Sequence, residues 1–314
     1  MSVVKLPEAM GILPLRERYA QALVALRGEE DVPASRVGLS SLRLLNPRMG
    51  IPLWRGRAYV PGKVILTNLF NHRQTPIDLG WSVKKSQVED FRGGDLTYDS
   101  HNGTDLAIPV GTTVVAPAAG CVVRVVSEFN RGGLKVFLDH GDGLMTCCAH
   151  LARPLVEEGD VVGRGEPIAI SGYSGLDGFA TFPFGVPHVH FNTWLNGVPV
   201  DPFARAGEVS LWREGAPVPT QAEEDAETYT PSVYDEAGVD ALVESCVTAH
   251  VRDALRQIEP LERRAAYAVI GRNYYPTRFA QDIAPYREIH PRSARLDLPF
   301  LSGDFDGVVF ADAL

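Results

Sequence analysis

Hydrophobic and polar positions alternate in short runs through the middle of the chain, from about residue 96 to residue 205. These runs are rich in valine and isoleucine, and glycine turns separate them at about the 8–12-residue spacing that is typical of a β-sandwich or barrel. The candidate strands are residues 113–116, 120–127, 134–139, 144–150 and 166–171. We therefore expect a mainly β core, built as a small antiparallel β-sandwich or open barrel.

The flanking parts of the chain show helical periods instead. Residues 15–27 and 239–258 place apolar side chains at the spacing of an amphipathic helix, and Pro260 ends the second of these segments. A further helix is predicted from Leu261 to Ile270, and the apolar run Lys63–Phe70 is predicted to be a strand. Beyond Tyr274 the pattern is irregular. The fold class expected for the whole chain is therefore α+β.

These patterns divide the chain into four parts. A flanking region over residues 1–95 precedes the β-rich region 96–205, and a linker over 206–235 leads to a helical C-terminal region over 236–314. The linker is rich in proline and in acidic residues, which are Glu223, Glu224, Asp225 and Glu227. A charge run of this kind is usually a solvated segment.

Composition narrows the classes of function. The 314 residues carry a formal net charge of -9, so binding of nucleic acid or of an anionic membrane by bulk electrostatics is not expected. The four cysteines show no paired spacing, which suits a reducing compartment. The N-terminus lacks the apolar core of a signal peptide, and no run reaches the roughly 18 apolar residues of a membrane span. We expect a cytoplasmic protein unless a non-standard route exports it.

A histidine pair ends the β-rich region. In an extended strand His188 and His190 project from one face, whereas Val189 and Phe191 pack on the other. Upstream, His101 and Asp105 lie four residues apart, a spacing that also keeps them on one face. Imidazole and carboxylate are zinc ligands, and three protein ligands leave the fourth position of a catalytic zinc open. One member of the histidine pair would supply the third ligand.

Three motifs occur in a fixed order over about 90 residues: His101-x-x-x-Asp105, Ala149-His150-Leu151 and His188-x-His190-Phe191. In this order the chain resembles the lysostaphin/LytM-type zinc endopeptidases, which cleave peptide bonds in peptidoglycan, over residues 97–203. The resemblance implies one zinc ion per chain, held by His101, Asp105 and His190. It implies that His150 and His188 handle protons and stabilise the oxyanion, and that the substrate is peptidoglycan or a related peptide.

The chain departs from the family pattern at two positions. Cys148 stands where the family usually has tyrosine, and Asn192 follows the second histidine motif where glutamate is common. The loop from Tyr173 to Pro187 is long and aromatic. Its phenylalanines either line a substrate groove, or fill the core or pack under the C-terminal helices. In some relatives a preceding segment covers the zinc with an asparagine, a role that Asn68 or Asn71 could take here.

Two other classes of function stay open from the sequence. One is a catalytically silent relative that acts as a scaffold or activator. The other is a metal-free histidine phosphocarrier of similar β architecture, although Asp105 would repel a phosphohistidine beside it. His140 lies in the predicted hairpin turn 139–143, and we expect a structural role for it.

Overall fold

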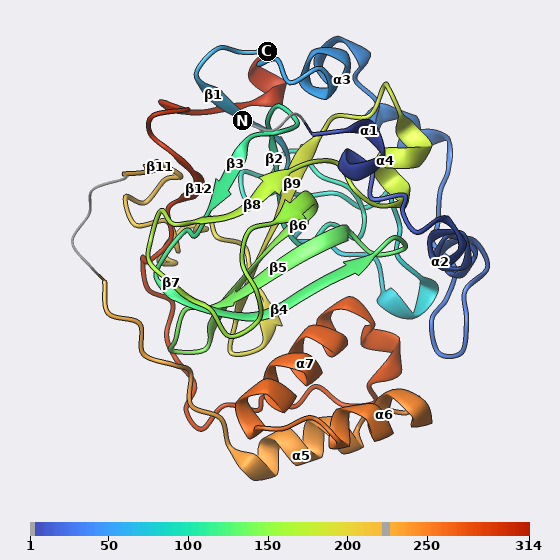
Figure 1. The fold of residues 1–314 in the computed structure, drawn as a ribbon, viewed down its shortest axis with the longest axis vertical. Coiled ribbons are helices and arrows are strands. Elements are labelled where there is room, and N and C mark those ends of the chain that lie inside the picture. Colours follow the sequence, from blue (N-terminus) through green and yellow to red (C-terminus); the bar gives the residue numbers. More distant parts are fainter. Residues whose placement is uncertain (1–3, 222–226) are drawn as a thin grey trace.

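A computed structural model describes residues 4–221 and 227–314 of the chain, so Glu223, Glu224 and Asp225 of the predicted acidic linker lie outside the described residues. Its centre is an open sheet with the strand order β13-β1-β2-β9-β6-β5-β4-β7. Every neighbouring pair is antiparallel except β1 and β13. Figure 1 shows this sheet with helices around it. The strands are β1 (Lys63–Asn68), β2 (Thr104–Ala107), β4 (Gly120–Glu128), β5 (Gly133–Asp139), β6 (Leu144–Pro154), β7 (Val161–Val162), β9 (His188–Leu195) and β13 (Gly307–Phe310).

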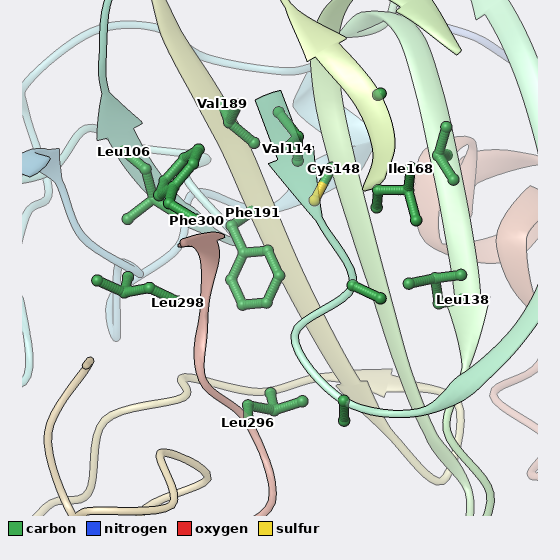
Figure 2. Packing of buried hydrophobic residues seen from close by; sticks show 14 of the residues in the cluster. Leu106, Val114, Leu138, Cys148, Ile168, Val189, Phe191, Leu296, Leu298 and Phe300 are labelled. Carbon is green, nitrogen blue, oxygen red and sulfur yellow. The ribbon is translucent and has the colours of Figure 1, made fainter. Parts of the chain in front are cut away.

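A second, smaller layer covers one face of this sheet. Strand β3 (Thr113–Val115) pairs with β8 (Pro167–Ser171), which also pairs with the end of β6. Val114 and Ile168 from this layer belong to the same buried cluster as Cys148 and Phe191 from the main sheet (Figure 2). The result is an open sandwich rather than a closed barrel, which confirms the fold class expected from the sequence.

Helices cover the two ends of the opposite face. At one end, α5 (Glu236–Glu244), α6 (Ala249–Arg256) and α7 (Leu261–Tyr274) pack on alternate residues of three strands, which include Phe137, Cys147 and Trp194. At the other end, α3 (Pro47–Trp54) packs Met49 and Leu53 on β1 and β2. Burial of each such side chain contributes about 1.5–3 kcal/mol. Between the two helical covers lies a stretch of β2, β9 and β6 that is polar.

The C-terminal region differs from its sequence prediction. The predicted helix over 239–258 is two helices, because the backbone near Cys246 and Val247 pairs with Phe279 and Arg278 instead of continuing the helix. Helix α7 runs past the predicted end at Ile270 to Tyr274. The prediction that the remainder is irregular is wrong: β12 (Leu298–Leu301) pairs with β11 (Pro219–Thr220), and β13 extends the central sheet. Leu298 and Phe300 of β12 lie in the core.

The N-terminal region follows its prediction more closely. Helix α2 spans Leu15–Arg27, and β1 spans the first six residues of the predicted strand. The remaining elements are short: α1 (Leu6–Ala9), α4 (Leu176–Thr181) and β10 (Val198–Pro199). The division into four parts stays a prediction. Within the described ranges, no helix is both long and apolar enough to cross a membrane.

Candidate metal centre and catalytic histidines

Strand pairing brings the three motifs together. Asp105 in β2 lies directly opposite His190 in β9, and Ala149 in β6 lies opposite His190 on the other side. His150 follows Ala149 at the edge of the same face. The three motifs, which span about 90 positions in the sequence, are therefore neighbours in the polar stretch between α3 and α7. This arrangement agrees with the prediction that His188 and His190 project from one face of their strand.

Three potential ligand atoms converge in this stretch. Oδ1 of Asp105 lies 3.0 Å from Nε2 of His101 and 2.8 Å from Nδ1 of His190, and the two histidine atoms are 3.1 Å apart. Ligands at the usual zinc distances of 2.0–2.1 Å in a tetrahedron are separated by about 3.3 Å. The donor set thus has nearly the dimensions of one face of a zinc tetrahedron, and Asp105 and His101 are buried.

Hydrogen bonds around these side chains fix which atoms face one another. Nδ1 of His101 lies 2.6 Å from the carbonyl oxygen of Leu69, so in a neutral imidazole this nitrogen carries the hydrogen. Nε2 of His101 then presents a lone pair to the Asp105 carboxylate. Two electron-rich atoms facing each other in a buried site need a cation between them, so the residues present fit a metal ion.

The second carboxylate oxygen of Asp105, Oδ2, has a hydrogen-bond partner of its own. Oδ2 accepts a hydrogen bond of 2.8 Å from the side-chain nitrogen of Asn68 in β1. Burial by itself would raise the pKa of the Asp105 carboxyl, but electrostatic interactions with the imidazoles of His101 and His188, and the close approach of His101 and His190, hold this pKa well below its usual range. Asp105 is therefore an anion at neutral pH.

The two asparagines singled out in the sequence have different environments. Asn68 directs its amide nitrogen to Asp105, and β1 extends the sheet beside β2. Asn71 is fully buried away from the ligand atoms, and its side chain donates to the backbone carbonyls of Gln87 and Asp99. Asn71 therefore organises the loop before His101.

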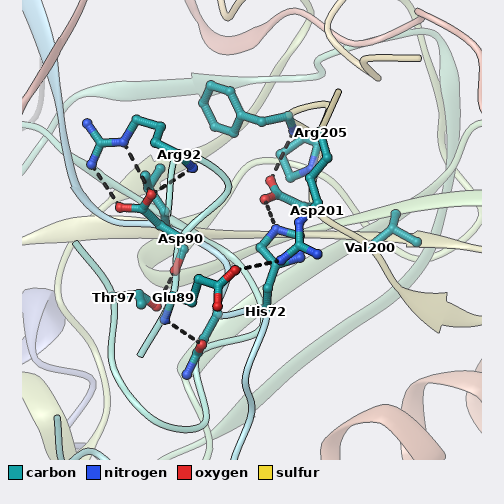
Figure 3. A network of polar contacts seen from close by, with 12 residues as sticks. His72, Glu89, Asp90, Arg92, Thr97, Val200, Asp201 and Arg205 are labelled. Carbon is teal, nitrogen blue, oxygen red and sulfur yellow. Dashed lines mark hydrogen bonds and ion pairs between the residues drawn. The ribbon is translucent and has the colours of Figure 1, made fainter. Parts of the chain in front are cut away.

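A polar network fixes that loop (Figure 3). Asp90 accepts hydrogen bonds from the backbone nitrogens of Gly94 and Leu96, and His72 binds Asp201 at 2.8 Å. The Thr97 hydroxyl donates to the Leu69 carbonyl, the same oxygen that orients His101. The loop thus positions a ligand through its backbone.

The second pair of histidines lies beside the first group. Nδ1 of His188 is 2.7 Å from the Val186 carbonyl, and Nδ1 of His150 is 2.8 Å from the Ser174 carbonyl. In the tautomer that donates through Nδ1, each ring leaves Nε2 as the second nitrogen that can face the site, and the ring centroids are 4.9 Å apart. His188 Nε2 lies 3.4 Å from Asp105 Oδ1, which places it at the edge of the metal-binding group.

His150 has an unusual backbone and a shifted pKa. Its φ of +61° lies in the left-handed region, which residues with a side chain seldom adopt except at functional sites. Hydrogen bonds from His150 N to Gly132 O and from Ser174 N to His150 O hold this conformation. Burial, and then the electrostatic interaction with His188, lower the pKa of His150 well below 6.5, so the His150 ring is neutral at pH 7.

Two tyrosines belong to the site although the sequence argument did not select them. Tyr173 is buried against the rings of His150 and His188, with centroid distances of 5.2 and 4.8 Å, and Tyr98 stacks on His101 at 4.4 Å. Tyr98 stands three residues before His101, and Tyr173 begins the aromatic loop, which is the signal that could have found it. Cys148 faces the hydrophobic cluster on the opposite side of the sheet, so its departure from the family pattern does not alter the site wall.

The aromatic loop contains α4, and its phenylalanines are exposed rather than packed in the core. Phe179, Phe182 and Phe184 are 54%, 41% and 49% exposed. Trp54 of α3 contacts Phe182 and Tyr173 at centroid distances of 5.1 and 5.8 Å. The prediction that these phenylalanines fill the core is therefore wrong; they lie on the surface, and Trp54 connects Phe182 to Tyr173, which packs on His188.

Helix α7 limits the polar stretch on the other side. Tyr274 at its end donates to Asn192 Oδ1 at 3.1 Å, and Asn192 Nδ2 in turn donates to the Asn102 carbonyl at 2.9 Å. Asn192 thus joins the C-terminal helices to the residue that follows His101. His140, by contrast, is buried between Ala119 and Thr146, outside the site, as the structural role predicted from its turn position implies.

Comparisons with known proteins identify a family for about a third of the chain. The description "Peptidase family M23" matches residues 99–202. The peptidoglycan DD-endopeptidase ShyB of Vibrio cholerae is 36% identical over 178 residues, which are 55% of this chain and 39% of that protein. ShyA of the same organism, also named a peptidoglycan DD-endopeptidase, is 34% identical over 129 residues, which are 40% of this chain and 28% of that protein. The crystal structure of a zinc-containing peptidase from Vibrio cholerae aligns with a TM-score of 0.33 and 26% identity, over 45% of this chain and 38% of that one.

The class of protein follows: the chain carries a peptidase family M23 domain, which contains all five residues of the site. The resemblance to lysostaphin/LytM-type peptidases is thereby confirmed. The chain spans less than two-fifths of the length of the two curated relatives compared with it.

Proposed function

We propose that the protein is a zinc-dependent metallopeptidase that hydrolyses peptide bonds in peptidoglycan or a related peptide. The observation that carries the proposal is the convergence of His101 Nε2, Asp105 Oδ1 and His190 Nδ1 within 4.8 Å of one another, beside the imidazoles of His150 and His188. The family match over residues 99–202 and the names of the relatives support the substrate class.

His101, Asp105 and His190 would hold the zinc ion, which when bound supplies Lewis acidity to water and to the scissile carbonyl. His150 is neutral at pH 7 and keeps Nε2 as an acceptor, so it suits the role of general base. His188, fixed through Nδ1 by the Val186 carbonyl, then donates or accepts a proton at Nε2 near the developing oxyanion. Tyr173 packs on these two rings and restricts their rotation.

Two alternatives are weaker on this geometry. A silent scaffold would not require three ligand atoms held by oriented hydrogen bonds. A phosphocarrier would place a phosphoryl group next to Asp105, which stays ionised beside the histidines. The electrostatic repulsion disfavours that chemistry.

The test combines metal analysis with hydrolysis. Protein purified without added zinc is expected to contain about one zinc ion per chain, to release peptides from purified peptidoglycan and to lose this activity on chelation. Addition of zinc, but not magnesium, should restore it. Metal-free protein that incorporates phosphate at a histidine would support the phosphocarrier, and zinc-containing protein that cleaves no peptidoglycan or peptide would support the scaffold.

A further inference from the structure

The hairpin between β4 and β5 carries an arginine, Arg131, that forms no direct ion pair among the described residues, although the carboxylates of Asp177 and Glu128 act on its charge from a distance. Among the residues that the structure describes, no carboxylate pairs with Arg131, and its buried Nε has no hydrogen-bond partner. The guanidinium instead lies against two aromatic rings, with its carbon 5.1 Å from the Trp81 ring centroid and 5.7 Å from that of Tyr275. Burial lowers the pKa of Arg131 to about 10, so the group stays protonated at neutral pH.

The backbone places Arg131 on the His150 side of the site. The next residue, Gly132, accepts the hydrogen bond from His150 N at 2.8 Å, and Gly132 packs against Ala149, which lies opposite His190. The hairpin is held in place because the Arg131 carbonyl accepts a hydrogen bond from the ammonium group of the buried Lys135. Arg131 is therefore presented by a rigid turn that also holds a catalytic histidine.

Trp81 belongs to the segment that is hydrogen-bonded to the residue before His101, whereas Arg131 belongs to the hairpin that is hydrogen-bonded to His150. Ser82, the neighbour of Trp81, is hydrogen-bonded through its backbone to Ser100, which directly precedes His101. The contact between Arg131 and Trp81 thus crosses from the segment that holds His150 to the segment that holds His101. Tyr275, at the end of α7, covers the third side of the guanidinium.

A second arginine, Arg278, contacts the same Tyr275 ring and does form an ion pair with a carboxylate. Arg278 lies 4.6 Å from the Tyr275 centroid, and its charge is paired with Glu29 at 2.5 Å. Arg131 has a similar aromatic environment, but Asp177 and Glu128, which act on its charge, form no ion pair with it. A half-buried, unpaired guanidinium is costly unless an anion completes its coordination, and its planar donors match a carboxylate.

We infer that Arg131 binds a carboxylate of the substrate at the α7 end of the site. A peptide whose scissile bond lies between His150 and the metal-binding group would present this carboxylate to Arg131, at a point where Tyr275 and Trp81 restrict further extension. The inference rests on the proposed function only in placing the substrate at this site. The carboxylate has two possible sources, a free C-terminus or an acidic side chain, and the experiment below separates them.

The experiment measures binding rather than turnover. Dissociation constants are determined by calorimetry for the acetylated peptide Lys-D-Ala-D-Ala with a free C-terminus, for its C-terminal amide, and for an amide with an acidic residue in place of lysine. The purified protein is expected to bind one of the carboxylate peptides roughly 10–100-fold more tightly than the uncharged-end amide, as for a hydrogen-bonded charge pair. The peptide that shows this preference identifies the source.

Variants assign the preference to Arg131. Arg131→Gln should abolish it, and Arg131→Lys should retain part of it because the charge stays. The matched control is Arg124→Gln, since Arg124 also stacks on a tyrosine of α7, at 4.4 Å from the Tyr267 centroid, but lies on β4 outside the site. Circular dichroism and melting temperature show whether each variant folds.

Outcomes for the inference and for the proposed function are distinct. A carboxylate preference that Arg131→Gln leaves intact, or the absence of any preference in wild-type protein that hydrolyses peptidoglycan, overturns the inference alone. A preference lost only in Arg131→Gln, in a protein that hydrolyses no peptide, supports the inference and counts against the proposed function.

Discussion

Ser174 and His150 form a reciprocal pair of hydrogen bonds: the Ser174 carbonyl accepts from His150 Nδ1 at 2.8 Å, and the Ser174 amide donates to the His150 carbonyl at 3.2 Å. The N-terminal segment supports this pair from behind. Ala9 O and Met10 O accept from the amides of Tyr173 and Gly175, on either side of Ser174. The orientation of His150 therefore depends on residues about 140 positions earlier in the chain.

The first prediction concerns this support. Gly11 has a φ of +62°, and an added Cβ would lie 2.8 Å from Ser174 Cβ. Gly11→Ala should displace Ser174 and lower kcat on the order of 10–100-fold, with zinc content unchanged. Gly159→Ala is the control, because Gly159 also has a positive φ but no atom within 4 Å of the added Cβ. Equal kinetic effects of the two substitutions would show that backbone strain alone is responsible.

Removal of the N-terminal region tests whether it supports the fold or only covers the zinc site. If the region before the domain only covered the zinc, removal of residues 1–92 would leave a folded, active protein. We expect unfolding instead, because β1 joins β2 to β13 and Asn71 organises the loop before His101. Circular dichroism of the truncated protein checks this, and a folded truncation with raised activity would restore the blocking role.

The second prediction separates the two histidines of the pair. His190→Ala should abolish zinc binding, since it removes one of three protein ligands, whereas His188→Ala should keep zinc and lower turnover by about 10²–10⁴-fold. Metal content by mass spectrometry and hydrolysis of peptidoglycan are measured on the same samples. Loss of metal in His188→Ala with retention in His190→Ala would invert the assignment.

The third prediction concerns Asn192, which links α7 to the residue after His101. Asn192→Ala removes the hydrogen bonds to Asn102 and Tyr274 and loosens the backbone beside His101. Zinc affinity, measured by competition with a chelator, should fall by about 10–100-fold. Tyr274→Phe keeps the Asn192–Asn102 bond, so its zinc affinity should stay near that of wild type. A larger loss in Tyr274→Phe than in Asn192→Ala would contradict this account.

The fourth prediction uses the exposed phenylalanines of the aromatic loop. Replacing Phe179 and Phe184 with serine should lower the free energy of unfolding by only about 1 kcal/mol each, because about half of each side chain is exposed. If they contact substrate, kcat/KM across a panel of peptides should fall most for apolar peptides. Zinc content should not change, and an unchanged peptide preference would assign the loop no role in specificity.

The fifth prediction is a pH dependence of stability. Burial lowers the pKa of His140 to about 4, below the value near 6.5 of the unfolded chain. The folded state thus binds the proton more weakly, so His140 contributes full stability above pH 6.5 and loses it progressively as the pH falls toward 4. The loss is up to about 3 kcal/mol. Urea unfolding of wild type and His140→Gln between pH 7 and 4 should give a flatter profile for the variant, and parallel profiles would refute the assignment.

Local patterns in the sequence determined the elements that the site needs. The two-residue spacing of His188 and His190, and the four-residue spacing of His101 and Asp105, specify which side chains share a face because side-chain direction in a strand is a local property. Alternation predicted β4, β5, β6 and β8, and the helical period predicted α2 to the residue. The ordered motifs further indicated which of the histidines belong to the site.

Only the tertiary structure decided what surrounds those side chains. The pairing of β13 with β1, the position of α7 over the sheet and the contact of Arg131 with Trp81 join residues that are far apart in sequence, where periodicity carries no information. The helix predicted over 239–258 was divided for the same reason, since Phe279 and Arg278 pair with its backbone. Long-range backbone pairing can override a local preference because it satisfies backbone polar groups that the isolated segment would otherwise have to satisfy within itself, and burial can do so because it removes apolar surface from water.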